Sequence, residues 1–216
     1  MPDRIGATLD NTADNGEMKG SWMSIPPEIL QRLQSSLDKA ARTPLPEPAA
    51  MTLATCEPSG QPSVRTVLLR AVDARGLVFF TNLGSRKSRQ IRDNPRAALC
   101  FYWPPLAEQL IIEGEVEPID DAEADRYWRT RPRNSQIGAW ASRQSESVPS
   151  RFTLLRRVVA FTTRFGAGSV PRPWFWSGYR VVPNRIEFWR NRPFRLHERL
   201  CYERQGETWT HRLLYP

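Results

Sequence analysis

The stretch SVRTVLLRAVDARGLVFFTNLGSRKSRQ, residues 63–90, decides the fold. It holds two segments rich in aliphatic and β-branched residues, 63–72 and 77–82, separated by the turn sequence DARG. Two such segments joined by a short turn predict adjacent antiparallel strands. A short helix is expected from Ser85 to Arg92, and Asn94 with Pro95 is expected to end it.

The same pattern continues on both sides of this stretch. Further strands are expected at 51–56, 97–103, 109–119, 176–182, 186–189, 195–203 and 209–214. Further helices are expected at 26–42, 120–130, 135–142 and 151–165, with Ser24 and Ser135 as candidate caps. Helices and strands do not alternate regularly, and short turns join the strands. We therefore predict a mainly β fold, an antiparallel sheet or small barrel with peripheral helices.

A length of 216 residues fits one domain with a tail. Residues 1–22 are polar and show no period, so we expect a flexible tail there and a single domain over 23–216 that begins with a helix. No apolar run reaches the roughly 20 residues of a membrane span, and the N-terminus lacks the apolar segment of a secretory signal. The widely spaced Cys56, Cys100 and Cys201 predict reduced thiols in a cytoplasmic protein.

The net charge of +8 raises the possibility of nucleic-acid binding. The basic residues, however, are scattered in ones and twos and never form a run of three, so a nucleic-acid partner is not expected. A site for a small phosphorylated ligand would use a few of these arginines equally well. With His197 and His211 as the chain's two histidines, no metal site is expected.

Two polar clusters lie within the deciding stretch. In RTVLLR, residues 65–70, the odd spacing of Arg65 and Arg70 points them to opposite faces of a strand, which favours two surface arginines. In FFTNLGSRKSRQ, residues 79–90, hydroxyls and cations surround a helix start. That arrangement is typical of an anion site, although a solvated first turn of the helix has the same composition.

Two more clusters follow later in the chain. The segment 126–146 carries Tyr127, Arg131, Ser135, Gln144 and Ser145 among tryptophans and could by itself be a structural corner.

In the segment 186–204, Arg195, His197 and Arg199 alternate, so all three are predicted on one face of a strand. Three such groups repel one another unless an anionic or aromatic ligand lies there. This triplet is the strongest indication of a site that comes from the residues alone.

The four clusters together resemble the pyridoxine/pyridoxamine 5′-phosphate oxidase family, which binds FMN. The resemblance covers about residues 48–216 and rests on RTVLLR, FFTNLGSRKSRQI, EQLIIEG, RPRNSQIGAWASRQS, IEFW and RLHER, which occur in that order. It implies an antiparallel split β-barrel and a homodimer with two FMN molecules in clefts between the subunits.

The resemblance also implies which residues bind FMN. Arg65 and Lys87 would hold its phosphate, and Gln109 would reach the flavin of the other subunit. The remaining cofactor-binding residues implied are Thr66, Val67, Leu68, Leu69, Arg70, Phe80, Thr81, Arg86, Gln144, Ser145, Trp189 and Arg199.

For the substrate, the resemblance implies that Tyr127, Arg131 and Ser135 bind a phosphate, with Arg70 as a further cation. Arg195 and His197 would lie over the pyridine ring as the catalytic pair. The implied reaction oxidises the 4′ carbon of pyridoxine or pyridoxamine 5′-phosphate by hydride transfer to the flavin. O2 then accepts the electrons and gives H2O2.

The chain departs from the family pattern on the substrate side. Arg70 stands where the family has lysine, Phe80 stands where it usually has tyrosine, and its charged N-terminal segment is not recognisable. Flavin oxidases of phenazine biosynthesis share RLHER and the RQSE stretch and also differ at the lysine position, so they form the alternative. A non-catalytic FMN-binding protein is a second alternative, although it would not need Arg195 and His197.

Overall fold

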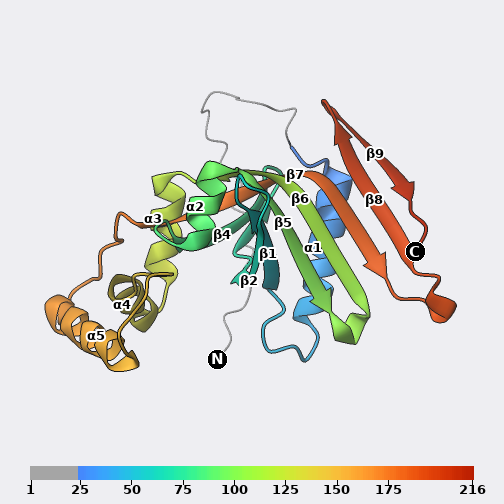
Figure 1. Ribbon diagram of the computed structural model, residues 1–216. Helices are drawn as coiled ribbons and strands as arrows, with labels where there is room; N and C mark the ends of the chain where they lie inside the picture. The colour runs from blue at the N-terminus through green and yellow to red at the C-terminus, as the bar shows by residue number, and fades with distance from the viewer. Residues whose placement is uncertain (1–23) are drawn as a thin grey trace.

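The computed structural model describes residues 24–216, and the tail expected over 1–22 lies outside them. Within the described part, nine strands form one antiparallel sheet in the order β2-β1-β5-β6-β7-β4-β3, with β8 added to β7 and β9 to β8. The sheet curls, with α1 beside it and α2 to α5 gathered at the other end (Figure 1). The mainly β, antiparallel prediction is confirmed.

The strands are β1 Ala50–Cys56, β2 Pro62–Leu68, β3 Ala71–Asp73, β4 Gly76–Asn82, β5 Arg96–Trp103, β6 Glu108–Pro118, β7 Trp176–Arg190, β8 Glu198–Gln205 and β9 Thr208–Leu213. The α-helices are α1 Pro27–Ala41, α2 Arg86–Asp93, α3 Asp121–Thr130, α4 Arg133–Ala141 and α5 Arg151–Phe165. Short 3-10 turns lie at Pro104–Leu106 and Pro193–Arg195.

Strand β7 is where the sheet divides. Its first half pairs with β4 and its second half with β8, while β6 pairs with β7 from Tyr179 to Arg190. The sequence predicted two separate strands here, and that prediction is wrong. A register shift between Glu113 and Gly114 of β6 absorbs the irregularity instead. A Cβ on Gly114 would come within 2.1 Å of the Val182 carbonyl oxygen, so glycine allows this close approach.

The helix starts follow local chemistry. Ser85 caps α2 by accepting the Ser88 backbone N–H, and Asp120 caps α3 in the same way through Glu123. The caps predicted at Ser24 and Ser135 are wrong. Prolines 26 and 132 stand at those N-cap positions, and Ser135 lies inside α4.

Two hydrophobic clusters hold the layers together. The larger one joins the apolar face of α1, which includes Leu33 and Leu37, to the inner side chains of the sheet. The smaller one joins α3, α4 and α5 to the start of β7 around Trp128, Ile137 and Trp176. We call this second region, α3 to α5 with the start of β7, the helical end.

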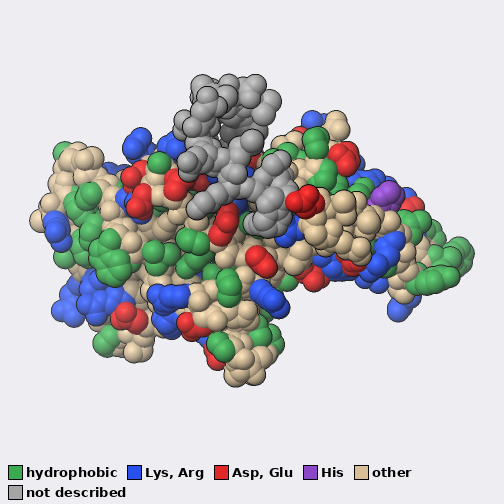
Figure 2. All heavy atoms as spheres, turned by 90° about the horizontal axis from the view of Figure 1, so that it is seen from above, with side chains coloured by type: hydrophobic (Ala, Val, Ile, Leu, Met, Phe, Trp, Pro, Cys, Tyr) green, Lys and Arg blue, Asp and Glu red, His purple; other side chains and the backbone are tan. Residues whose placement is uncertain are grey.

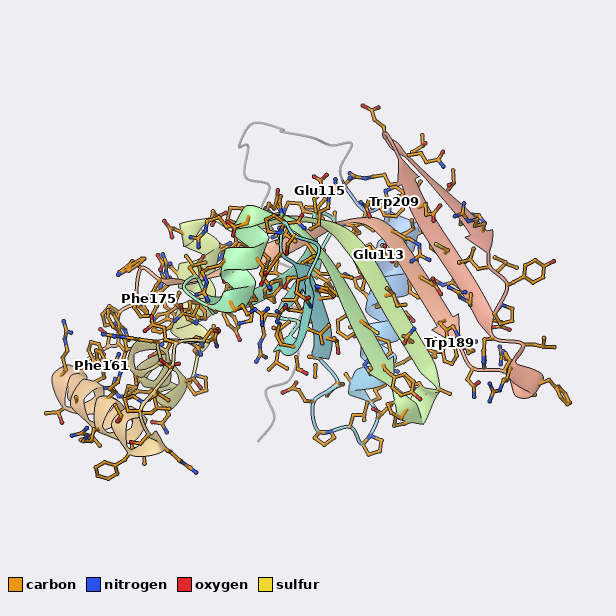
Figure 3. The ribbon with its side chains drawn as sticks, in the orientation of Figure 1. Glu113, Glu115, Phe161, Phe175, Trp189 and Trp209 are labelled. Carbon is orange, nitrogen blue, oxygen red and sulfur yellow. The ribbon has the colours of Figure 1, made fainter. Side chains whose placement is uncertain are left out.

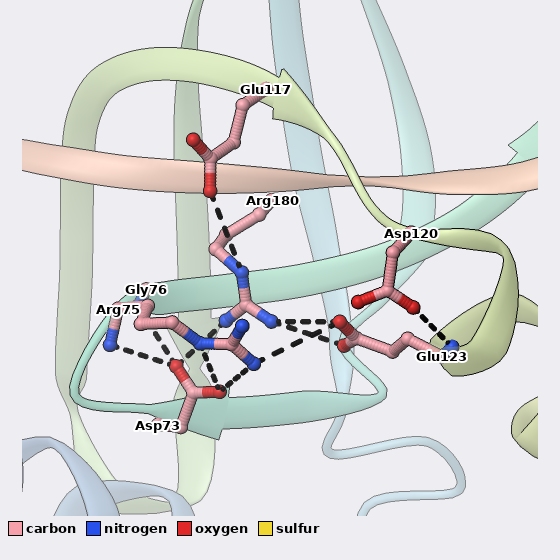
Figure 4. Close-up of polar contacts among 7 residues, drawn as sticks. All are labelled: Asp73, Arg75, Gly76, Glu117, Asp120, Glu123 and Arg180. Atoms are coloured by element: carbon pink, nitrogen blue, oxygen red, sulfur yellow. Dashed lines mark hydrogen bonds and ion pairs between the residues drawn. The ribbon is translucent and has the colours of Figure 1, made fainter. Parts of the chain in front are cut away.

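A buried arginine fixes the helical end to the sheet. Arg180 of β7 is 2% exposed and pairs with Asp73 at 2.7 Å and with Glu123 of α3 at 3.0 Å (Figure 4). A third carboxylate, Glu117, lies 3.8 Å from its Nε. Buried charges require such partners. The network therefore ties the first turn of α3, the helix that carries Tyr127, to β7 and β3.

The three cysteines are free, as predicted. Among the described residues, no helix is long and apolar enough to cross a membrane. The same part of the chain contains no cluster of three or more His, Cys, Asp or Glu side chains arranged to hold a metal ion.

Candidate active site

A pocket of about 870 Å³ opens where β2 and β4 meet α2, α3, α4 and the loop after α4. We call it the main pocket. The predicted residues that line it are Arg65, Thr66, Val67, Leu68, Arg70, Phe80, Thr81, Arg86, Lys87, Tyr127, Arg131, Ser135, Gln144 and Ser145. The structure thus brings three of the four sequence clusters together. Leu69 is buried in the larger core instead.

Lys87 is a buried cation at the inner end of this pocket. Its Nζ donates to Gln144 Oε1 at 2.8 Å, Thr81 Oγ1 at 3.1 Å and Ser85 Oγ at 3.3 Å. Burial, and then the charge of Arg65, lower the pKa of Lys87 to about 8. All three acceptors are neutral, so the ammonium has strong donors but no counter-charge among them. An anion is the ligand that this arrangement favours.

Arg65 is held beside Lys87 by residues that the sequence did not single out. Its Nη1 donates to Thr55 Oγ1 at 2.5 Å and to the Leu53 carbonyl at 3.2 Å, and its Nη2 donates to Gln90 Oε1 at 3.1 Å. Burial lowers the pKa of Arg65 as well. The prediction of two surface arginines is therefore wrong for Arg65, whereas Arg70 is exposed, as predicted. The strand ends at Leu68, and Arg65 is turned into the fold.

The loop after α4 completes this end of the pocket. Ser145 has a φ of 72° and accepts the backbone N–H of Arg86, the first residue of α2, at 3.1 Å. The Arg86 side chain reaches outward to Glu57 at 3.1 Å. The FFTNLGSRKSRQ cluster therefore combines a helix start with Lys87 and Arg65, which supports its anion-site reading.

A second pair of cations, Arg70 and Arg131, lies in the same pocket. Arg131 stacks on two indoles, with its Cζ 4.6 Å from the Trp176 ring and 5.1 Å from the Trp128 ring. Its Nη1 is buried with no hydrogen-bond partner among residues 24–216, and burial lowers the pKa of Arg131. Arg70 lies over the Tyr127 ring at 5.8 Å. The pocket thus has two separate cationic groups.

The other predicted residues lie elsewhere in the subunit. Gln109 and Trp189 line a second groove of about 650 Å³ beside α1. Trp189 belongs to the end of β7 that lies opposite Phe161 and Phe175 of the helical end (Figure 3). We call Gln109, Trp189, Arg195, His197 and Arg199 the C-terminal group.

The predicted geometry of the C-terminal group needs two corrections. Arg195 lies in a 3-10 turn with a φ of 63°, and His197 precedes β8, so the alternating strand face does not exist. Arg199 is also not an unpaired cation. Its Nε lies 2.7 Å and its Nη2 3.1 Å from the two carboxylate oxygens of Glu187. The repulsion argument therefore fails, because a buried carboxylate neutralises the site.

His197 is held by its neighbours on the same turn. Its Nδ1 accepts the Arg192 backbone N–H at 3.3 Å, and its ring lies 4.7 Å from that of Trp189. The contact with Trp189 joins two members of the C-terminal group at the far end of β7.

Three residues of these sites were not predicted from the sequence. Trp176 lines the main pocket, Gln90 positions Arg65, and Glu187 pairs with Arg199. Glu187 stands in the quoted motif IEFW, where a polar residue among apolar ones was an available signal, whereas Gln90 stands among other polar residues of FFTNLGSRKSRQ and gave none. Trp176 gave no signal of its own, because a tryptophan at a strand start fits an ordinary core position.

Comparison with known families now assigns the chain. Residues 37–164 match the family described as Pyridoxamine 5′-phosphate oxidase. Residues 176–216 match the Pyridoxine 5′-phosphate oxidase C-terminal dimerisation region. The chain belongs to the pyridoxamine 5′-phosphate oxidase family.

Members of the oxidase family are similar over most of their length. The Pyridoxine/pyridoxamine 5′-phosphate oxidase of Alkalilimnicola ehrlichii is 60% identical over 168 residues, covering 77% of this chain and 86% of that one. The protein of the same name from Rhodospirillum rubrum is 52% identical over 185 residues, covering 83% and 92%.

Solved structures agree with the split-barrel fold. PhzG from Burkholderia lata, solved with tetrahydrophenazine-1-carboxylic acid, superposes with a TM-score of 0.84 at 31% identity, covering 94% of this chain and 98% of that one. A pyridoxamine 5′-phosphate oxidase-related, FMN binding protein from Nostoc punctiforme gives a TM-score of 0.71 at 19% identity, covering 89% and 100%. The second similarity shows the fold alone.

Proposed function

We propose that this chain is an FMN-dependent oxidase that converts pyridoxine or pyridoxamine 5′-phosphate to pyridoxal 5′-phosphate, with O2 as acceptor and H2O2 as product. The observation that carries the proposal is the presence of two cationic groups in one pocket. One is Arg65 with Lys87, and the other is Arg70 with Arg131. A phosphorylated cofactor together with a phosphorylated substrate needs two such groups.

The residues at the inner end fit FMN. Lys87 is buried, its three hydrogen-bond acceptors are neutral, and Arg65 lies close enough to lower its pKa. A phosphate dianion would supply the missing negative charge and accept several charge-assisted hydrogen bonds at once. Arg65 and Lys87 would hold the phosphate, while the backbone of β2, with Phe80 and Thr81 of β4, would border the flavin.

The outer group fits a substrate phosphate. Tyr127, Arg131 and Ser135 come from α3, its C-cap and α4, so a phenol, a guanidinium and a hydroxyl share one wall of the pocket. Arg70 adds a second cation whose planar fork suits phosphate oxygens. The arginine at this position therefore keeps the charge of the family's lysine, although not its shape.

We further propose that two copies of the chain build each complete site. The chain carries the family's dimerisation region, and its C-terminal group lies away from the main pocket of its own subunit. In a homodimer, Gln109, Trp189 and Arg199 would border the FMN held by the other subunit. Arg195 and His197 would cover the substrate ring there, since guanidinium groups stack on aromatic faces.

Bound FMN would supply the hydride acceptor for oxidation of the substrate's 4′ carbon, and O2 the final oxidant. The chain's own residues bind and orient. Arg131 and its neighbours fix the phosphate end of the substrate, and Arg195 holds the ring, which sets the distance of the reacting carbon from the flavin. His197 can hydrogen-bond a ring substituent.

The cytoplasmic location inferred from the cysteines stays a prediction.

The alternative is a related oxidase that acts on a phenazine precursor. The likeness to PhzG, solved with tetrahydrophenazine-1-carboxylic acid, favours it at 31% identity. Such a ligand, however, carries a carboxylate and no phosphate, which would leave the set around Arg131 underused. The relatives at 50–60% identity are named for the vitamin B6 reaction. A non-catalytic FMN-binding protein would not need Arg195 or His197.

The test is an oxidation assay on FMN-loaded protein in air. We expect aldehyde and peroxide in equal amounts from pyridoxine 5′-phosphate and from pyridoxamine 5′-phosphate, with ammonia as well from the amine. An Arg131→Ala variant should lose affinity for both substrates. If neither substrate yields aldehyde and the variant keeps the parental ligand affinity, the vitamin B6 assignment is wrong, and tetrahydrophenazine-1-carboxylic acid becomes the substrate to assay.

A further inference from the structure

We propose that Trp176 is a positioning residue for the substrate phosphate, because its ring holds both Arg131 and the aromatic stack that carries Tyr127. This inference rests on the proposed function, since it takes Arg131 and Tyr127 as phosphate-binding residues. Trp176 lies at the first position of β7 and is 5% exposed, so it forms the floor of the pocket and not its rim.

The first contact is with the cation. The Cζ of Arg131 lies 4.6 Å from the centroid of the Trp176 ring, closer than its 5.1 Å distance from Trp128. Trp128 packs against Trp176 edge to face, with 4.8 Å between the ring centroids. The two indoles therefore form a corner in which the guanidinium lies, and a desolvated cation–π contact of this kind is among the stronger ones.

The second contact is with the phenol. Phe80 lies nearly parallel to Trp176, at 5.3 Å and 4°, and Tyr127 lies against Phe80 at 4.0 Å and 15°. Trp176 and Tyr127 are themselves 6.1 Å apart. Through this stack, one indole fixes the position of two groups that come from different places on α3.

The choice of an aromatic partner has a chemical consequence. A carboxylate beside Arg131 would neutralise it and occupy its N–H donors. An indole face stabilises the positive charge and takes none of the donors that point away from the ring. The buried Nη1 of Arg131, which lacks a hydrogen-bond partner within residues 24–216, fits a guanidinium kept ready for an incoming anion.

The position of Trp176 relative to α3 is itself fixed. Arg172, four residues earlier, donates from Nη1 to the Trp176 carbonyl at 2.9 Å. The same guanidinium pairs with Asp121 at 2.6 Å and with Asp125 at 2.5 Å, both on α3. The start of β7 and the helix that leads to Arg131 are thus joined on both sides of the indole.

The test compares Trp176→Leu, which removes the π face, with Trp176→Phe, which keeps one. Trp174→Leu is the matched control, because Trp174 is a neighbouring indole that is 83% exposed and contacts Phe175. We expect Trp176→Leu to raise KM for pyridoxine 5′-phosphate about tenfold with kcat changed less than about threefold. Trp176→Phe and Trp174→Leu should stay within about threefold of the parent protein.

Two measurements separate positioning from a general packing defect. Calorimetric titration should show weaker binding of pyridoxal 5′-phosphate to Trp176→Leu, while the affinity for unphosphorylated pyridoxal is unchanged. In an Arg131→Ala background, Trp176→Leu should have little further effect, since the residue through which it acts is gone.

Three results would overturn the proposal. They are equal loss of affinity for both ligands, a Trp176→Phe variant as poor as Trp176→Leu, or full additivity with Arg131→Ala. The Phe variant keeps the question answerable if the Leu variant does not fold. Should the parent protein bind pyridoxal 5′-phosphate but oxidise neither substrate, the proposed function fails, while the binding comparison still tests the role of Trp176.

Discussion

The main pocket and the C-terminal group both depend on arginines, but their charges are treated in opposite ways. In the pocket, Lys87 and Arg65 bond to neutral oxygens, and Arg131 rests on two indoles. In the C-terminal group, Arg199 makes two contacts to the buried carboxylate of Glu187. The pocket keeps its positive charge available, whereas the C-terminal strands neutralise theirs.

This difference indicates an anion-binding role for the cations of the main pocket and a structural role for the ion pair of Arg199. Burying a cation without a counter-charge costs free energy, which an incoming anion can recover. The pocket is therefore suited to binding an anion. The carboxylate-paired Arg199 gains little from a further anion, so its role is to present a rigid surface. The basic side chains gathered over the helical end of the molecule (Figure 2) are exposed, whereas Lys87 in the main pocket is buried.

The largest effect, on the free energy of unfolding, is expected at Arg180, which holds the first turn of α3 beside the main pocket. Arg180→Ala leaves Glu123, 15% exposed, without its closest cation. Removing one partner from a buried pair costs about 3 kcal/mol or more of unfolding free energy. Chemical denaturation should show this loss. The control is Arg75→Ala, whose pair with Asp73 is largely exposed and should contribute less than about 1 kcal/mol. Equal losses would mean that the network does not anchor α3.

The next effect is the affinity for FMN. Lys87→Ala removes a buried donor whose charge-assisted hydrogen bond to phosphate is worth about 1.5 to 3 kcal/mol, so affinity should fall about tenfold or more. Flavin fluorescence quenching on titration of apo-protein measures it. Arg89→Ala, an exposed cation on the same helix, is the control and should bind as the parent does. Parental affinity in Lys87→Ala would remove Lys87 from the cofactor site.

The pKa of Lys87 gives this affinity a pH dependence. With a pKa of about 8 in the free protein, Lys87 is charged below pH 8 and neutral above it. A bound phosphate favours the charged form and raises the pKa in the complex. FMN affinity should therefore be greatest below pH 8 and fall by up to about tenfold per pH unit above it. Lys87→Arg stays charged, so its affinity should be flat over the same range. A matching fall in both proteins would contradict this origin.

The smallest effect is expected in the C-terminal half. Glu187→Gln keeps the shape of the side chain but leaves Arg185 and Arg199 without its charge. If Glu187 only orients Arg199, FMN affinity should fall by about threefold to tenfold, less than for Lys87→Ala. Glu203→Gln removes a partly exposed carboxylate from Arg185 and serves as the control. A larger effect from Glu187→Gln than from Lys87→Ala would reverse the comparison.

The sequence predicted the fold well where the signal is local. Strand β4, helix α2 and the acidic start of α3 depend on neighbours in the chain and are confirmed. The single strand predicted over 63–72 is wrong, because it divides into β2, which pairs with β1, and β3, which pairs with β4. The wrong predictions depend on distant contacts. Arg199 was expected to repel its neighbours, because Glu187 stands far from it in the 186–204 segment and comes beside it only when β8 pairs with β7.

The sequence predicted which residues form the candidate site better than it predicted how they are arranged. Motifs named most of the residues that line the main pocket, because each motif is continuous in sequence. The indole corner around Arg131 was not predictable, since Trp176 reaches it only when β7 pairs with β4 and α3 folds back on both. Arg195 was placed on a strand because the alternation of Arg195, His197 and Arg199 was interpreted as strand periodicity, whereas Arg195 lies in a 3-10 turn.

The central claim is that each site needs the main pocket of one copy and the C-terminal group of another. The first requirement is a stable dimer, twice the 24.9 kDa chain mass, by light scattering of the FMN-loaded protein. A stable monomer with bound FMN would remove that requirement and the claim with it.

The most direct test is a mixed dimer of two differently tagged and inactive variants, Arg131→Ala in one copy and His197→Ala in the other. In such a dimer, one site combines an intact pocket with an intact C-terminal group, and the other site lacks both. The account predicts that the purified mixed dimer regains about half of the parental turnover per dimer, although both homodimers are nearly inactive. A mixed dimer as inactive as its two homodimers would contradict it.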